Sequence, residues 1–193
     1  MAQAEYERAM RNHEAPDRYL RFCRNATPVP RGSLSGGSPF EVQFPTECTV
    51  AGLRLSTSIF NQFDDTLVFV QPVYRLADGR VEMGPGWGKP TDAVHTVTAR
   101  EGHAFAGMIL SSRWPFRMGI KLVFMRLKEG RLDPDDSYES EWFGSNDGPA
   151  WQTRMVSRGK RVLGIYGRAG DAIDALGLRL TDDELPEDEP AQK

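Results

Sequence analysis

A loop that combines glycines with a carboxylate lies close to the C-terminal end of the chain. It has the spacing Gly-x-x-x-Asp from Gly170 to Asp174, and two β-type runs, 161–166 and 173–180, flank it. Glycine tolerates backbone conformations that other residues resist, so such a loop can expose backbone N–H groups beside the carboxylate. Because a hydroxyl group both donates and accepts hydrogen bonds, this combination suits a neutral, hydroxyl-rich ligand.

The same residues also fit a tight turn, in which the Asp174 carboxylate accepts hydrogen bonds from the backbone of its own loop. Residue chemistry alone leaves both interpretations open. Five basic residues lie beside the loop in the sequence, and they would either attract a sulfated or phosphorylated glycan or an acidic protein segment, or simply be solvated. These residues are Arg154, Arg158, Lys160, Arg161 and Arg168.

Other chemistries have little support in the sequence. His13, His95 and His103 lie on separate segments without metal-ligand spacing, and the chain has no Gly-x-Ser-x-Gly motif, P-loop or Cys/His constellation. The acidic pairs Asp64-Asp65 and Asp135-Asp136 fall in turn-like stretches. We therefore expect a protein that is not an enzyme and that needs neither a metal nor another cofactor.

Composition and charge narrow the class of protein. The 193 residues suffice for one domain with a substantial core, and a net charge of −3 gives no overall footprint for nucleic acid. No run is apolar for the ~18 residues of a membrane span. Residues 1–25 are charged throughout and lack the apolar segment of a secretory signal, so we expect a soluble, cytoplasmic protein.

Three regions with different character follow one another along the chain. Residues 1–34 hold two short helical patterns and a Pro/Gly-rich linker, and they predict a helical N-terminal extension. Residues 35–180 predict a single all-β domain, because short β-type runs alternate with turn residues. Residues 181–193 are acidic and contain proline, which indicates a disordered tail. The β-type runs are 40–44, 50–56, 66–75, 94–98, 104–110, 119–127 and 161–166.

The β region repeats itself. The pattern apolar-x-Gly-apolar recurs at Gly52, Gly107 and Gly164, and these glycines are 55 and 57 residues apart. The tripeptide Leu-Val-Phe at 67–69 returns at 122–124, again 55 residues later. Three similar units of about 50 residues predict a closed assembly with pseudo-threefold symmetry, in which each unit buries a face that it could not bury alone.

The sequence also resembles a known family. The run 162–177, Val-Leu-Gly-Ile-Tyr-Gly-Arg-Ala-Gly-Asp-Ala-Ile-Asp-Ala-Leu-Gly, is similar to the closing segment of jacalin-related lectins. Residues 36–40 resemble the glycine-rich opening of that domain, and 50–55 resemble its first repeat. The resemblance covers about 35–180. It implies the β-prism I fold, with three four-stranded Greek-key sheets around a pseudo-threefold axis.

The resemblance implies a function as well. Members bind mannose- or galactose-type sugars without metal, on the Gly-x-x-x-Asp loop and the facing glycine-rich loop. Here Asp174 would accept hydrogen bonds from two sugar hydroxyls, and backbone N–H groups of the two loops would donate. Binding of one sugar would be weak, so several sites, as in a homo-oligomer, would raise avidity. The expected site residues are Gly36, Gly37, Gly170, Asp171, Ala172 and Asp174.

One departure from the family pattern favours a second hypothesis. Many members carry an aromatic residue in the Gly-x-x-x-Asp loop, where this chain has Ala172 and a second acid, Asp171. The alternative function is a non-enzymatic protein-interaction module. In it the β-prism would be a scaffold, and the N-terminal extension or the basic hairpin would contact the partner.

Overall fold

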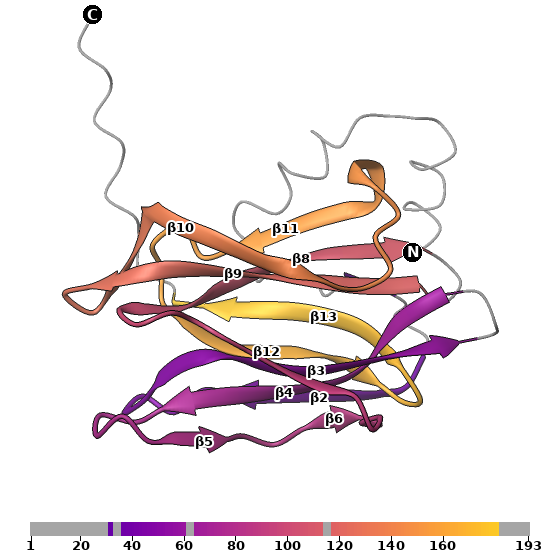
Figure 1. Ribbon diagram of the computed structural model, residues 1–193, viewed down its shortest axis with the longest axis horizontal. Helices are drawn as coiled ribbons and strands as arrows, with labels where there is room; N and C mark the ends of the chain where they lie inside the picture. Colours follow the sequence, from indigo (N-terminus) through magenta and orange to yellow (C-terminus); the bar gives the residue numbers. More distant parts are fainter. Residues whose placement is uncertain (1–30, 33–35, 61–63, 114–116, 182–193) are drawn as a thin grey trace, which may run out of the picture.

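The computed structural model describes residues 31–32, 36–60, 64–113 and 117–181. These residues form three antiparallel sheets arranged around a shared interior (Figure 1). The described part contains thirteen strands and one short 3-10 helix, η1, at Pro149–Trp151. The sheets are called sheet A, sheet B and sheet C below.

Sheet A joins the two ends of the described chain. Its strand order is β1-β13-β12-β2, so two strands come from the N-terminal side and two from the C-terminal side. The pairing of β12 with β2 runs from Gly164 opposite Gln43 to Ala169 opposite Ser38. The strands are β1 (Arg31–Gly32), β2 (Ser38–Gln43), β12 (Val162–Ala169) and β13 (Ile173–Leu180).

Sheets B and C are built from continuous stretches of chain. Sheet B has the order β5-β4-β3-β7, with the short strand β6 also paired to β4. Its strands are β3 (Thr49–Phe60), β4 (Asp64–Arg75), β5 (Val81–Met83), β6 (Trp87–Gly88) and β7 (Val94–Thr98). Sheet C has the order β10-β9-β8-β11. Its strands are β8 (His103–Arg113), β9 (Arg117–Lys128), β10 (Arg131–Gly144) and β11 (Gln152–Val156).

The strand order of sheet C is a Greek key. Three consecutive strands are joined as hairpins, and the fourth returns to lie beside the first. Sheet B follows the same path, with β7 returning to β3. The prediction of an all-β, β-prism I architecture with three sheets is therefore confirmed, although sheet B has five strands instead of the expected four, because β6 adds a second short pairing to β4.

The repeated glycines mark the same point in each sheet. Gly52, Gly107 and Gly164 each follow a register shift in the first strand of the central hairpin. A Cβ on any of the three would overlap a backbone carbonyl of the returning strand, at Val97, Met155 or Val42 respectively. Only glycine permits this close approach, and this explains why the motif recurs three times.

The repeated Leu-Val-Phe tripeptide is not structurally equivalent in the two sheets. Gly52 lies opposite Val73 in β4, whereas Gly107 lies opposite Val123 in β9. In sheet B the tripeptide 67–69 ends before Val73, the residue opposite the bulge glycine. In sheet C the tripeptide 122–124 includes Val123, the residue opposite the bulge glycine. The glycine part of the predicted repeat holds, and the Leu-Val-Phe part was wrong, because the hairpins of sheets B and C differ in length.

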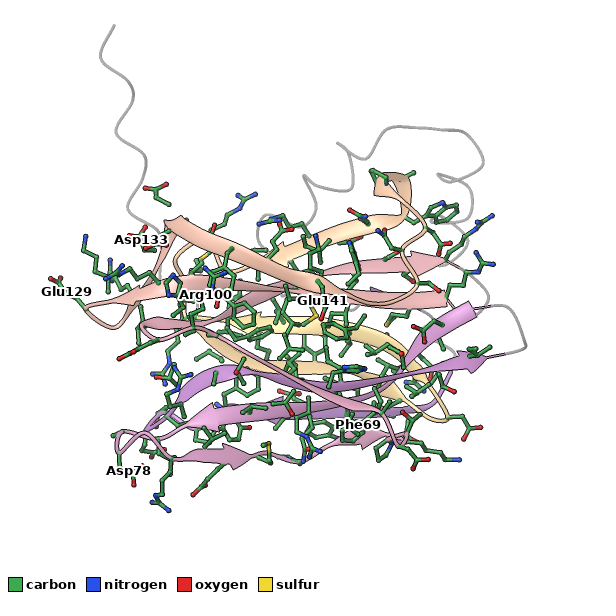
Figure 2. The ribbon with its side chains drawn as sticks, viewed as in Figure 1. Phe69, Asp78, Arg100, Glu129, Asp133 and Glu141 are labelled. Carbon is green, nitrogen blue, oxygen red and sulfur yellow. The ribbon has the colours of Figure 1, made fainter. Side chains whose placement is uncertain are left out.

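All three sheets contribute large apolar side chains to one core. Each such side chain contributes ~1.5–3 kcal/mol when it is fully buried. Figure 2 shows side chains filling the space between the sheets, while the labelled Asp78 and Glu129 lie at the tips of turns. The largest fully buried side chains are Leu53, Leu55, Leu67, Phe105, Met108, Leu110, Ile120, Leu122, Phe124, Ile165, Leu176 and Leu178.

The expected divisions of the chain stay predictions. The helical patterns of the N-terminal extension and nearly all of the acidic tail lie outside the described residues. Within residues 1–34, Arg31 and Gly32 pair with Leu176 and Ala175 of β13. At least this part of the region assigned to the extension belongs to sheet A.

The bulge glycines provide a test of the fold. We expect Gly52→Ala to lower the free energy of unfolding by about 3 kcal/mol, because its methyl group would push the backbone of β7 away. Gly79→Ala is the control, since Gly79 has a φ of +84° but open space around it, and it should cost only ~1 kcal/mol. Urea unfolding measures both. Equal losses would contradict the close-approach role of Gly52.

Candidate functional site

The turn between β12 and β13 presents Asp174 on a β-bulge. Arg168 lies opposite Ala175 and Ala169 lies opposite Ile173, so Asp174 is the extra residue of the bulged strand. The Gly170 N–H donates to the Ala172 carbonyl over 2.9 Å, which closes the turn. Because a bulge redirects the side chain of its extra residue, the Asp174 carboxylate leaves the regular alternation of β13.

The glycine-rich segment before β2 lies directly against this carboxylate. A Cβ on Gly36 would overlap the Asp174 carboxylate, and a Cβ on Gly37 would lie 2.5 Å from its Oδ2 atom. Gly37 also has a φ of +50°, which favours glycine. Gly170 completes the cluster, because a Cβ there would lie 3.3 Å from the Gly37 Cα atom. The two predicted loops therefore meet at Asp174.

The environment of Asp174 disfavours its charged form. Burial raises the pKa of this carboxyl group, the nearby Arg168 guanidinium opposes that rise, and the Asp171 carboxylate adds to it. Within the described residues the carboxylate accepts no hydrogen bond. The tight-turn interpretation, in which Asp174 bonds to the backbone of its own loop, is therefore wrong. A half-buried acceptor stays available to a donor from outside.

Arg168 joins the two loops. Its Nε–H donates to the Gly36 carbonyl over 2.5 Å, and an Nη2–H donates to the Gly37 carbonyl over 2.6 Å. The side chain is half-buried, so solvent screens these charge-assisted bonds less than it would at a fully exposed surface. One guanidinium group on β12 therefore holds both glycines of the N-terminal segment.

A third segment borders the site from sheet B. The Lys89 ammonium lies 2.5 Å from Asp171 Oδ1, and this ion pair lowers the pKa of Asp171. Trp87 on β6 stacks on Phe40 of β2, with ring centroids 4.7 Å apart and an interplanar angle of 13°. In Figure 1, β6 and the β12–β13 turn lie at the same end of the molecule. The aromatic stack and the ion pair hold the segment from Trp87 to Lys89 against sheet A.

The basic residues beside the loop do not form one free patch. Arg168 binds the glycine carbonyls, Arg161 donates to the Thr46 carbonyl over 2.8 Å, and Arg154 pairs with Glu139 at 2.5 Å. Three of the five therefore have partners within the protein. Of the two interpretations of these basic residues, the anion-attracting cluster receives no support from this arrangement.

The structure places the six sequence-predicted residues at one end of sheet A. Gly36, Gly37, Gly170 and Asp174 lie in mutual contact. The Asp171 side chain is exposed and turns to Lys89, and Ala172 is half-buried in the turn. Sequence reasoning missed Lys89 and the contacts of Arg168 with the glycine-rich loop. The run Gly-Pro-Gly-Trp-Gly at 84–88 indicates an irregular segment before Lys89, but nothing in the sequence links that segment to Asp171.

The described residues contain neither a metal-ligand cluster nor a helix that could span a membrane. In the described ranges no three or more His, Cys, Asp or Glu residues are grouped so that they could hold a metal ion. Among the same residues no helix has the length and hydropathy that a membrane crossing needs. His95 packs against Phe143, while His103 contacts Asp136 at 3.2 Å, so these two histidines serve different local contacts.

A separate open groove of about 400 Å³ lies between the edge strands β7 and β10. Its lining is mainly polar and includes Thr96, Thr98, Ser140 and Glu141. None of the six predicted residues lines it, so the groove is separate from the Asp174 site. The hydrogen-bonding groups that suit a hydroxyl-rich ligand, a carboxylate beside backbone N–H groups, lie at Asp174 and not in this groove.

Comparisons with known proteins point to one fold. Models of protein families gave no match to the sequence, and neither did the curated proteins. Similar solved structures include Malaysian banana lectin, with 16% identity and a TM-score of 0.56 over 81% of this chain and 97% of that one. Calystegia sepium agglutinin has 15% identity and a TM-score of 0.57, over 81% and 95% of the two chains.

A third solved structure carries the family name in its description. It is a mannose binding jacalin related lectin from Ananas comosus, with 18% identity and a TM-score of 0.51 over 79% of this chain and 94% of that one. These likenesses cover nearly the whole of each lectin. They agree with the three Greek-key sheets and with the family resemblance of the sequence. The chain therefore has the β-prism fold of the jacalin-related lectins.

Proposed function

We propose that this protein is a non-enzymatic carbohydrate-binding protein that holds its ligand without metal at Asp174. The observation that carries the proposal is the Asp174 carboxylate, which is half-buried against two glycines and accepts no hydrogen bond within the described residues. A half-buried acceptor without a partner loses part of its hydration without a hydrogen bond to replace it, and this costs free energy. A ligand that supplies donors would remove that cost.

The chemistry of a sugar fits this arrangement. Two adjacent hydroxyl groups donate to the two oxygens of Asp174, and backbone N–H groups of Asp171, Ala172 and the glycine-rich segment donate to sugar oxygens. Each charge-assisted bond contributes ~1.5–3 kcal/mol, so the affinity for a monosaccharide is modest. Association of several copies of the chain would raise avidity, because each copy supplies one such site.

The descriptions of the similar structures suggest which sugars to test first. The champedak lectin, at 17% identity and a TM-score of 0.56, and the Ananas comosus lectin are both described as mannose binding. A Calsepa lectin structure is described as a complex with a biantennary N-glycan. We propose mannose-type sugars as the first candidates and galactose-type sugars as the second. The cytoplasmic location expected from the sequence stays a prediction.

The role of Asp174 is tested by replacing its charge. We expect Asp174→Asn to weaken binding of methyl mannoside at least tenfold, because neutral hydrogen bonds replace charge-assisted ones. The same change should raise the free energy of unfolding at pH 7, since it removes a carboxylate that burial disfavours. Calorimetric titration and urea unfolding measure the two effects.

A matched variant controls for general effects of charge on sheet A. Glu41→Gln on β2 removes a carboxylate that pairs with Arg179 at the surface. We expect it to leave sugar affinity within twofold of that of the unchanged protein. Unaltered binding in Asp174→Asn, or equal losses in both variants, would contradict the assignment of the site.

The raised pKa of Asp174 predicts a pH dependence. The ionised carboxylate accepts the sugar hydroxyls, so affinity falls as pH decreases through the pKa of this group. Because burial raises that pKa, the fall begins at a higher pH than it would for an ordinary aspartate of pKa 3.8. Titrations between pH 3.5 and 8 measure it, and Asp174→Asn should lack this step. A step of the same size in the variant would show that another group is responsible.

The second candidate function is a scaffold for a protein partner. The observation that favours it is the turn itself, where Ala172 offers little surface and the Lys89–Asp171 ion pair lies exposed at the rim. The N-terminal residues that this hypothesis would use lie outside the described part. Saturable sugar binding that Asp174→Asn abolishes would argue against this role as the main one.

A further inference from the structure

The glycine-rich segment needs a support from outside itself. The ladder between β2 and β12 begins at Ser38, opposite Ala169, so Gly36 and Gly37 lie beyond the regular pairing. Neither glycine has a side chain that could anchor it, and glycine carries the largest conformational entropy in the absence of such constraints. Their carbonyl groups instead accept the two bonds from Arg168, at 2.5 and 2.6 Å.

The two bonds fix the orientation of two consecutive peptide groups. In a trans peptide the C=O and the following N–H point in opposite directions. With the carbonyls of Gly36 and Gly37 directed at the guanidinium group, the N–H groups of Gly37 and Ser38 are directed away from it. Arg168 therefore determines where the donors of this segment point.

Arg168 also acts on the second part of the site. Its positive charge opposes the rise in the pKa of Asp174 and so favours the ionised carboxylate. A neutral side chain of similar size would remove this effect together with both hydrogen bonds. A lysine would keep the charge but lose the planar fork that reaches two carbonyls at once.

We propose that Arg168 is a positioning residue for sugar binding: it orients the donors of the glycine-rich segment without contacting the ligand. This inference rests on the proposed function at Asp174. It differs from both interpretations of the sequence, in which Arg168 belonged to a basic cluster that either attracts anionic ligands or is simply solvated.

The test compares two arginines that make similar bonds at opposite ends of sheet A. Arg168→Met removes the bonds to Gly36 and Gly37, whereas Arg161→Met removes the bond from Arg161 to the Thr46 carbonyl. We expect at least a tenfold loss of methyl mannoside affinity in the first variant and less than a twofold loss in the second. Arg168→Lys should fall between Arg168→Met and the unchanged protein.

A second readout separates positioning from general stability. The backbone order parameters of Gly37 and Ser38, measured by 15N NMR relaxation, should fall in Arg168→Met and stay unchanged in Arg161→Met. The pH at which affinity falls should also move upward in Arg168→Met, since the opposing positive charge is gone. Arg168→Lys, which keeps the charge, should show little of this upward movement. If Arg168→Met does not fold, the affinity and the order parameters of Arg168→Lys decide the question.

The outcomes are distinct. Failure of the unchanged protein to bind either mannose- or galactose-type sugar overturns the proposed function and, with it, the role of Arg168. Sugar binding that Arg168→Met and Arg168→Lys retain in full overturns only the positioning role. A loss of affinity without lower order parameters at Gly37 and Ser38, and without the pH change, would also overturn it, because that result indicates a structural effect elsewhere.

Discussion

The pairing of β2 with β12 is the interaction on which the rest of the structure depends. It closes sheet A between segments that are more than 100 residues apart, and it becomes possible because Gly164 leaves room for the carbonyl of Val42. The same ladder carries Gly36 and Gly37 to the β12–β13 turn. Loop closure over such a distance costs entropy, which the shared core of three sheets offsets. The fold and the candidate site therefore both depend on the pairing of β2 with β12.

The site carries features that a purely structural turn would avoid. Asp174 is half-buried without a hydrogen bond in the described part of the chain, and Gly37 adopts a positive φ. Each of these features lowers stability. Arg168 offsets part of that cost through its charge and its bonds to the glycine carbonyls. Such a concentration of unfavourable local features in one place is typical of binding sites rather than of ordinary hairpins.

Much of this arrangement could be predicted from the sequence, since its strongest signals are local. The Gly-x-x-x-Asp spacing and the recurring bulge glycine depend on short-range backbone geometry, and both lie where they were expected. The Leu-Val-Phe repeat led to a wrong prediction, because an identical tripeptide does not show how long the hairpin around it is. The two copies therefore lie at different positions relative to the bulge glycine. Lys89 could not be assigned, because it meets Asp171 only through the packing of β6 against sheet A. Arg168 was misjudged because its carbonyl partners are 131 and 132 residues away.

The central claim is that a sugar binds between the glycine-rich segment and the β12–β13 turn. A 15N NMR titration of the unchanged protein with methyl mannoside and methyl galactoside tests it most directly. The account predicts saturable shifts for at least one sugar, largest at the amides of Gly36, Gly37, Asp171 and Ala172. It would be contradicted if neither sugar produced saturable shifts, or if the largest shifts lay on another surface, such as the groove between β7 and β10.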